Sequence, residues 1–96
     1  MFIVMLTYQK PMAVIDALMP QHVAWLKRHY ASGLFIASGR RVPRVGGVIL
    51  AKSGDAVALE AALALDPFIK QGAARFEWVE FTPSMTAPGA AALKSL

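Results

Sequence analysis

The segments predicted as strands carry apolar side chains on both faces, and few folds of a chain this short can bury both. The clearest segment is residues 2–8, which is rich in β-branched, aromatic and aliphatic side chains. Because side chains alternate across a strand, one face holds Phe2, Val4, Leu6 and Tyr8, and the other holds Met1, Ile3, Met5 and Thr7. Residues 46–52 and 75–81 have the same two-sided character. Such strands need a sheet that is covered on both faces.

Two helices are predicted between these strands. Pro20 suits an early position of a first helix that continues through Ser32, with Gly33 as its C-terminal cap. A second helix covers residues 56–65; it is opened by Ser53, Gly54 and Asp55 and limited by Pro67. The remaining predicted elements are strands at 34–38, 46–52 and 75–81, a loop at 39–44 and a short turn at 67–71.

The order of these elements is βαββαβ. Right-handed crossovers then predict an α+β, ferredoxin-like fold: a four-stranded antiparallel sheet with both helices on one face and the first and third strands in the centre. Because the helices cover only one face, the apolar second face predicts face-to-face association of two copies, a homodimer. We expect one domain over residues 1–83 and a C-terminal tail, residues 84–96, without a clear period.

Composition narrows the class of protein. The chain has 96 residues, of which 56% are hydrophobic and 17% charged, which is unusually apolar for one small domain. Its apolar runs are shorter than the roughly 18 to 20 residues that a membrane-spanning helix needs, and no basic segment precedes the first strand as in a signal peptide. The absence of cysteine excludes disulfides, thiol nucleophiles and thiolate metal sites. These features predict a cytoplasmic protein that does not bind a membrane.

The net charge of +4 is mild, and the basic residues cluster only at Arg40, Arg41 and Arg44. No aromatic residue interleaves with these arginines, as a groove for single-stranded nucleic acid requires. We therefore expect a solvated loop or a contact with a small anion, and no nucleic-acid partner.

Asp66 stands where a helical pattern stops, before Pro67 and Phe68, and with His22 it is the best candidate for chemistry. With Pro20 in the first turn, His22 would lie near a helix N-terminus, where the dipole favours the neutral imidazole that a general base needs. A nearby Asp66 would fix the tautomer and orientation of that ring. The alternatives are a partly buried, hydrogen-bonded histidine and an aspartate that caps a short helix begun by Pro67.

The other histidine offers no metal site. His29 follows His22 by about 10 Å along the helix axis, which is too far for the two rings to share a metal ion. We therefore expect no metal, and we place His29 at the surface or in a subunit contact.

Small residues at strand ends suit contact with a ligand. Ser38 followed by Gly39 fits a strand end that meets a ligand or a tight turn, and Gly46 and Gly47 would permit close backbone approach. These glycines do not form a phosphate-binding fingerprint, because no helix follows them at the required spacing.

Taken together, these residues resemble the YCII-related (YciI-like) family of small proteins over roughly residues 1–83. The shared pattern consists of His22 with Trp25 and Leu26, Gly33, the Ser38 and Gly39 pair, Gly46 and Gly47 before an apolar strand, and Asp66, Pro67 and Phe68 followed by Gly72 and an aromatic strand ending at Pro83. The resemblance implies a dimeric α+β barrel, with His22 and Asp66 as an active-site pair and Ser38 near the same cleft. Two positions depart from the family pattern: Met19 and Pro20 stand where an arginine often precedes the histidine, and Arg40 replaces a common proline.

Three functions remain open. The leading hypothesis is a small, homodimeric, cofactor-independent enzyme of the lyase or isomerase type, in which His22 at a cleft rim acts as general acid or base and Asp66 orients it. Ser38, Gly39 and Arg40 would bind the substrate, and the arginine suits a carboxylate or phenolate. The second hypothesis is a noncatalytic dimeric module that binds a metabolite in the same cleft, in a regulatory role. The third is an accessory dimeric domain without a small-molecule site.

Overall fold

Four antiparallel strands form one sheet in the order β2-β3-β1-β4. The central strands are β1 (Phe2–Tyr8) and β3 (Gly46–Ala51), and the edges are β2 (Phe35–Arg40) and β4 (Ala74–Glu80). The computed structural model describes residues 1–52 and 54–96. Ser53, which the sequence places at the opening of the second helix, lies outside the described residues. The first and third strands are central, as their two-sided apolar pattern predicts.

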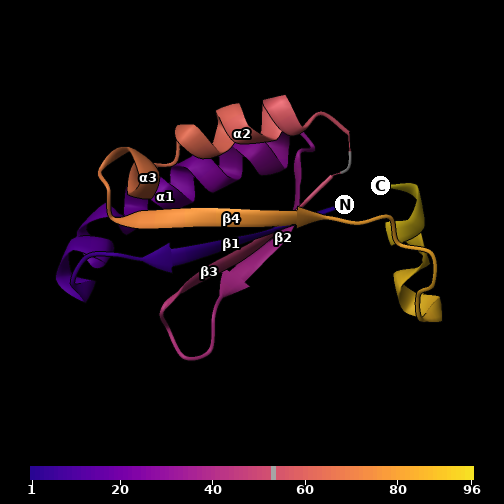
Figure 1. Cartoon of the computed structure of the whole chain (residues 1–96), viewed down its shortest axis with the longest axis horizontal. Coiled ribbons are helices and arrows are strands. Elements are labelled where there is room, and N and C mark those ends of the chain that lie inside the picture. Colours follow the sequence, from indigo (N-terminus) through magenta and orange to yellow (C-terminus); the bar gives the residue numbers. More distant parts are fainter. Residues whose placement is uncertain (53) are drawn as a thin grey trace.

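The two long helices, α1 (Met12–Ala31) and α2 (Ala56–Ala64), cover the same face of the sheet (Figure 1). A short helix, α3 (Pro67–Lys70), follows α2 and leads into β4. In the described part of the chain, no helix covers the other face. The order is therefore βαββαβ with α3 added before the last strand, and the predicted α+β, ferredoxin-like fold is confirmed.

The core lies between this helical layer and the sheet. Val4 of β1 pairs with Ile49 of β3, and both side chains are buried on the helix-covered face. Trp25 of α1 is fully buried in the same layer, and its indole N–H donates a 3.0 Å hydrogen bond to the carbonyl of Ala62 in α2. This bond ties the two helices together and satisfies a polar group that is removed from water.

The first helix begins at Met12, well before the predicted start at Pro20. Pro20 is therefore inside the helix, and His22 lies in its second half instead of near its N-terminus. An interior proline removes one backbone hydrogen bond and costs about 3 kcal/mol. The buried face nevertheless continues through it, from Ile15 to His22 and Trp25, and burial of this face offsets the lost bond. The positive end of the helix dipole therefore lies at Met12 and does not act on His22, in contrast to the prediction.

Other boundaries differ from the predictions because strand pairing continues past the expected ends. β2 extends to Arg40, which pairs with Gly47, so Gly39 and Arg40 belong to a strand instead of the predicted loop. The remaining ends of helices and strands shift by single residues, a difference that carries no structural argument.

The predicted close backbone approach at Gly46 is confirmed. A Cβ atom at this position would lie 1.7 Å from the backbone oxygen of Leu6. Only a residue without a side chain allows β3 to begin this close to β1.

The open face of the sheet is apolar near its centre. Ile3 pairs with Leu50 and Met5 pairs with Val48 on this face, and Val79 of β4 lies beside Ile3. Met5 is 38% exposed and Val79 is 55% exposed. A contiguous apolar patch on a sheet is typical of an interaction surface. This is the face on which the sequence predicts a second copy, and that association stays a prediction.

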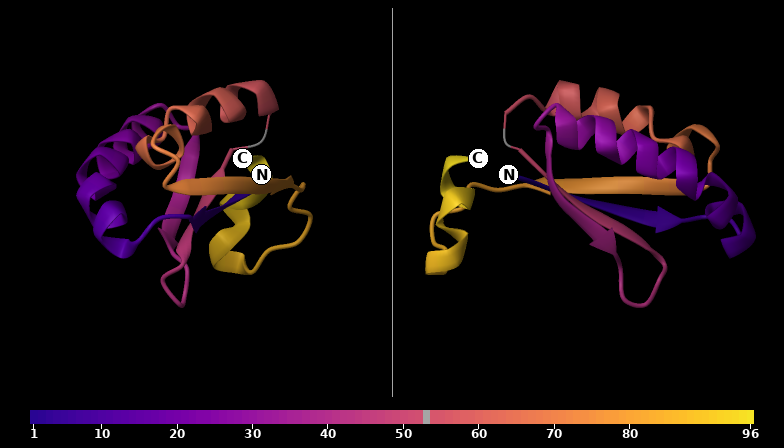
Figure 2. Two further views of the ribbon diagram at one scale, coloured as in Figure 1. Left: turned by 60° about the vertical axis from the view of Figure 1, so that its left-hand side comes forward. Right: turned by 180° about the vertical axis from the view of Figure 1, so that it is seen from behind.

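The chain after β4 extends away from the sheet and forms a 3₁₀ helix, η1 (Pro88–Ser95), beyond the end of the domain (Figure 2). None of the residues of η1 is buried. The sequence indicates no periodic element here, because a 3₁₀ helix repeats every three residues and so matches neither the α-helical nor the strand period. The division into a domain over residues 1–83 and a tail over residues 84–96 stays a prediction.

None of the helices in residues 1–52 and 54–96 combines the length and the hydropathy required to cross a membrane. The cytoplasmic location is still a prediction.

Candidate functional site

His22 and Asp66 are distant in sequence and meet beside the core. The Nδ1 atom of His22 lies 2.9 Å from Oδ1 of Asp66, which is fully buried. The buried face of α1 supplies the histidine, and the segment between α2 and α3 supplies the aspartate. A carboxylate accepts hydrogen bonds, so Nδ1 carries the proton and the neutral ring keeps its lone pair on Nε2. The predicted contact is confirmed, and a catalytic role for the pair stays a prediction.

Asp66 fills both of the roles that the sequence offered as alternatives. Its Oδ1 atom accepts from Nδ1–H of His22 and, at 3.0 Å, from the backbone N–H of Phe68 in the first turn of α3. The same oxygen is therefore a helix cap and the partner of the imidazole. The other oxygen, Oδ2, is buried and has no hydrogen-bond partner in the described part of the chain. Because one oxygen is unpaired, the carboxylate depends strongly on the two bonds that it does form.

The His22 ring is packed into the surface of the core instead of standing at the rim of a cleft. It stacks on Phe68 with ring centroids 4.1 Å apart and planes at 15°, and its centroid lies 5.5 Å from that of Trp25. Only 9% of the His22 side chain is accessible. The ring is more deeply buried than a rim position implies, because the buried face of α1 carries His22 in line with Trp25.

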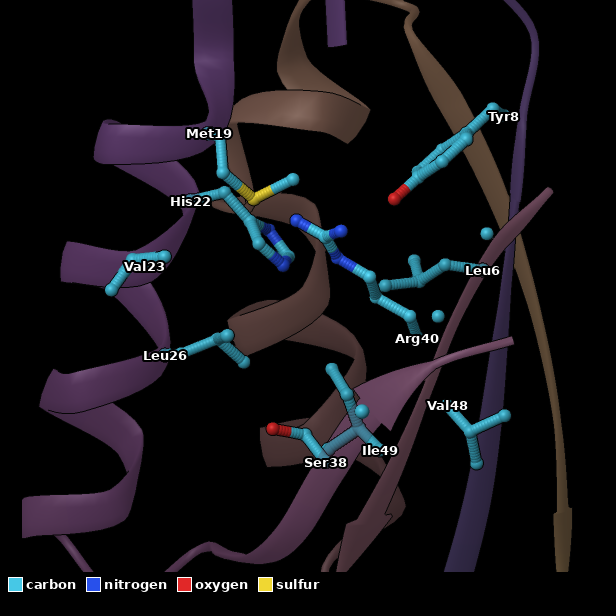
Figure 3. Close-up of a pocket in the computed structure, with 13 residues that line it drawn as sticks. Leu6, Tyr8, Met19, His22, Val23, Leu26, Ser38, Arg40, Val48 and Ile49 are labelled. Carbon is cyan, nitrogen blue, oxygen red and sulfur yellow. The ribbon is translucent and has the colours of Figure 1, made fainter. Parts of the chain in front are cut away.

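The accessible edge of His22 lines a pocket of about 260 Å³ between α1 and the sheet (Figure 3). Aliphatic side chains and a thioether form most of the wall: Leu6, Met19, Val23, Leu26 and Ile49. Figure 3 shows the Arg40 guanidinium and the Tyr8 hydroxyl pointing into the space beside the His22 ring. A cavity of about 150 Å³ holds benzene, so this pocket has room for one small ring with substituents.

The three residues predicted to bind substrate all line this pocket. Ser38, Gly39 and Arg40 lie in sequence along β2, at its end next to β3. The Tyr30 hydroxyl donates a 2.6 Å hydrogen bond to Oγ of Ser38, so the serine is held by a neighbour in α1. Their position at the pocket is established, and their role in binding stays a prediction.

Tyr8 is a pocket residue that reasoning from the sequence missed. It is the last residue of β1, and its ring meets Phe68 edge-on with centroids 5.8 Å apart. In the sequence, Tyr8 is one of four bulky residues on the same face of the first predicted strand. The available signal was its position, because a tyrosine that ends a central strand can pack its ring and still present its hydroxyl at the edge of the sheet.

The loop between β2 and β3 is fastened beside Tyr8. The backbone N–H of Tyr8 donates to the carbonyl of Val45 at 2.8 Å, and the Arg44 guanidinium donates to Asp16 of α1 at 2.7 Å. The hydrogen bond to Asp16 is the main cause that raises the pKa of Arg44; burial opposes it, and a hydrogen bond to Tyr8 raises it further. The arginine cluster is thus divided, because Arg40 faces the pocket while Arg44 holds the loop.

His29 is half-buried in one copy, and its expected place at the surface or in a subunit contact stays a prediction. Its ring centroid lies 5.4 Å from that of Trp25 and 5.1 Å from that of Phe35. Burial lowers the pKa of His29, and the charge of Arg28 lowers it further.

No group of three or more His, Cys, Asp or Glu side chains within residues 1–52 and 54–96 is arranged to hold a metal ion. The expectations of no metal and no cofactor stay predictions.

Comparisons with known proteins agree with the fold. The family model of the YCII-related domain matches residues 1–82. No protein with a curated description matches the chain.

Two solved structures are similar to this one. The 5-chloro-2-hydroxyhydroquinone dehydrochlorinase (TftG) from Burkholderia phenoliruptrix, in complex with 2,5-dihydroxybenzoquinone, is 15% identical, with a TM-score of 0.69 over 84% of this chain and 93% of that chain. A mutant of SnoaB, a cofactor-independent oxygenase from Streptomyces nogalater, is 21% identical, with a TM-score of 0.49 over 91% of this chain and 94% of that chain. At 15% identity, the similarity to TftG supports the fold alone.

Proposed function

Because the chain belongs to the YCII-related domain family, we propose that the pocket beside α1 is the active site of a small, cofactor-independent enzyme. His22 acts as general acid or base on a small organic substrate, and Asp66 orients its imidazole. Proton abstraction followed by elimination or isomerisation suits this pair, because the reaction needs a positioned base and no nucleophile.

The geometry of His22 carries the proposal. Its Nδ1–H is committed to Asp66 at 2.9 Å, so Nε2 is the ring nitrogen available to a ligand in the pocket. The stack on Phe68 prevents the ring from turning away. An oriented imidazole with a free lone pair beside a mostly aliphatic cavity has the properties of a general base.

The residues of β2 supply the binding side of the proposal. Ser38, Gly39 and Arg40 line the pocket, and Arg40 forms no ion pair with any described residue. Its guanidinium is therefore available for a carboxylate or phenolate of the substrate. TftG, which shares the fold, is named a dehydrochlorinase, and eliminations of this kind can begin with removal of a proton.

We also propose that the protein is a homodimer joined through the open face of the sheet. The apolar residues of β1, β3 and β4 on that face are partly exposed in one copy, and a two-fold symmetric contact would cover them. The fold is that of the dimeric α+β barrel superfamily, which supports the same arrangement.

A noncatalytic module that binds a metabolite is the second candidate. The burial of His22 favours this binding module. A ring that is stacked, hydrogen-bonded and 7% exposed can serve as a fixed hydrogen-bonding group without exchanging a proton.

Deuterium incorporation separates the two functions. Enolisable ketones, keto acids and hydroxyquinones are incubated with the protein in D₂O, and loss of their C–H signals is followed by proton NMR. We expect exchange with the wild type, a loss of about 10²- to 10⁴-fold with His22→Gln, and no loss with the control His29→Gln, since His29 lies outside the pocket. Saturable binding without exchange would support the binding module, and absence of both would overturn the two candidates together.

A further inference from the structure

We propose that Tyr8 is a further substrate-binding residue and that its hydroxyl donates a hydrogen bond to an oxygen of the substrate that carries negative charge. The substrate class is then a single-ring compound with a phenolate or enolate oxygen. This inference rests on the proposed function, because it takes His22 as the group that exchanges the substrate proton.

Phe68 fixes Tyr8 and His22 relative to each other. The His22 and Phe68 rings stack with their centroids 4.1 Å apart. The Tyr8 ring meets the Phe68 ring edge-on, with centroids 5.8 Å apart and planes at 80°. Phe68 is itself 1% exposed, and its backbone N–H is held by Asp66. The imidazole and the phenol therefore reach one pocket from a shared, rigid wall.

The contacts of Tyr8 leave its proton available. Its backbone N–H is bound to Val45 at 2.8 Å, and its side chain helps to raise the pKa of Arg44, which Asp16 holds at 2.7 Å. A guanidinium has only donors, so Arg44 does not compete for the proton of the Tyr8 hydroxyl. The O–H of Tyr8 is then free to donate to a ligand in the pocket.

Arg40 complements the same ligand oxygen. Figure 3 shows its guanidinium reaching the space beside the His22 ring, which the Tyr8 hydroxyl enters from the other side. An oxygen held between Tyr8 and Arg40 would receive the negative charge that develops when Nε2 of His22 removes a proton. Donors placed in advance where charge develops are among the strongest means of stabilising a transition state.

The remaining wall limits the ligand to a largely apolar molecule. Leu6, Leu26 and Ile49 line the pocket, whose volume is about 260 Å³. A sugar phosphate would place its hydroxyl groups against these aliphatic side chains without hydrogen-bond partners, whereas a ring with one or two oxygens would not.

Two aromatic probe ligands that differ by one oxygen atom test this inference. The affinities of 4-nitrophenolate and nitrobenzene are measured by equilibrium dialysis, and their ratio reports the contact with the oxygen. For the wild type we expect a preference for the phenolate. Tyr8→Phe should lower the affinity for the phenolate about 10-fold, as expected for one hydrogen bond to a charged group, and leave nitrobenzene unchanged. Thr82→Val, which removes an exposed hydroxyl outside the pocket, should change neither affinity.

A second variant guards against a folding defect. Arg44→Gln keeps the phenol and removes the charged group that fastens the neighbouring loop to Asp16, and because this loop binds the backbone of Tyr8 we expect a smaller drop in the phenolate-to-nitrobenzene ratio. Circular dichroism melts establish that each variant is folded. If Tyr8→Phe does not fold, an unchanged ratio in Arg44→Gln overturns the inference.

The outcomes separate this inference from the proposed function. An unchanged phenolate affinity in Tyr8→Phe, together with weaker binding in His22→Gln, overturns the role of Tyr8 and leaves His22 in place. Failure of the wild type to bind either ring also overturns the inference, whereas the proposed function fails only if deuterium incorporation is absent as well.

Discussion

The imidazole of His22 lies face to face with the ring of Phe68, at a centroid distance of 4.1 Å. The backbone N–H of Phe68 binds the same carboxylate, Asp66, that holds the edge of the imidazole. One short segment therefore supports the histidine twice, by a hydrogen bond in the plane of the ring and by a stack on its face. Two such contacts restrict both the position and the rotation of the ring.

This arrangement predicts that His22→Ala destabilises the fold. Removing the imidazole leaves Asp66 buried with one remaining hydrogen bond and leaves a void beside Phe68. We expect a loss of about 3 kcal/mol in the free energy of unfolding. Urea denaturation followed by circular dichroism measures it, with the exposed Lys27→Ala on the same helix as control. A loss below about 1 kcal/mol would mean that the ring is not an integral part of the core.

Asp66→Asn should uncouple stability from activity. The amide oxygen can still accept from Phe68, but the amide N–H₂ can donate to Nδ1 of His22 and so move the ring proton to Nε2. We expect a folded protein whose rate of deuterium exchange falls about 10²-fold or more. Exchange at the wild-type rate would show that the tautomer does not matter.

Much of the site was predictable because its signals are local. Asp66 before Pro67 marks the end of one helix and the start of another, and the cap is found. The contact with His22, 44 residues away, has no local signal, and the resemblance to the YCII-related family supported that expectation. The strands were predictable because their apolar alternation is strong and their order allows few topologies.

Features that depend on burial were not predictable from local patterns. The continuation of α1 through Pro20 follows from the burial of Ile15, which propensities do not weigh. The place of Tyr8 in the pocket depends on Phe68 and Val45, which are distant in sequence.

The lowered pKa of His29 predicts that stability falls with acid. Burial holds its pKa in the folded state below the ordinary value of 6.5. Above pH 6.5 the imidazole is neutral in both the folded and the unfolded state. As the pH falls through 6.5, His29 binds a proton in the unfolded chain first. The free energy of unfolding therefore decreases from pH 6.5 down to the folded-state pKa. His29→Gln should flatten the fall in the urea midpoint between about pH 7 and about pH 5. An equally steep fall in the variant would assign the acid sensitivity to other groups.

Gly46→Ala should destabilise the protein by about 3 kcal/mol or more, because the new Cβ would lie 1.7 Å from the backbone oxygen of Leu6. Gly39→Ala is the matched control, since a Cβ at that position meets nothing within 4 Å. Thermal melts compare the two variants. Equal melting temperatures would contradict the close contact between β1 and β3.

The open face of the sheet predicts a dimer that a single charge weakens. Val79→Glu places a carboxylate among the apolar residues of that face, and we expect sedimentation at micromolar concentration to shift from dimer to monomer. Val57→Glu is the control, because Val57 is exposed on α2, on the helical side of the sheet. Loss of the dimer in the control alone would place the interface on the helices.

The state of the His22 ring tests the central claim most directly. Nitrogen-15 NMR of the two histidine rings, recorded at a pH where both are neutral, distinguishes the nitrogen that carries the proton from the one that does not. We predict that Nδ1 of His22 is protonated, and that its Nε2 resonance alone shifts strongly when 4-nitrophenolate is added, while the resonances of His29 stay in place. A proton on Nε2 of the neutral His22 ring, or a bound ligand that leaves Nε2 unchanged, would contradict the account.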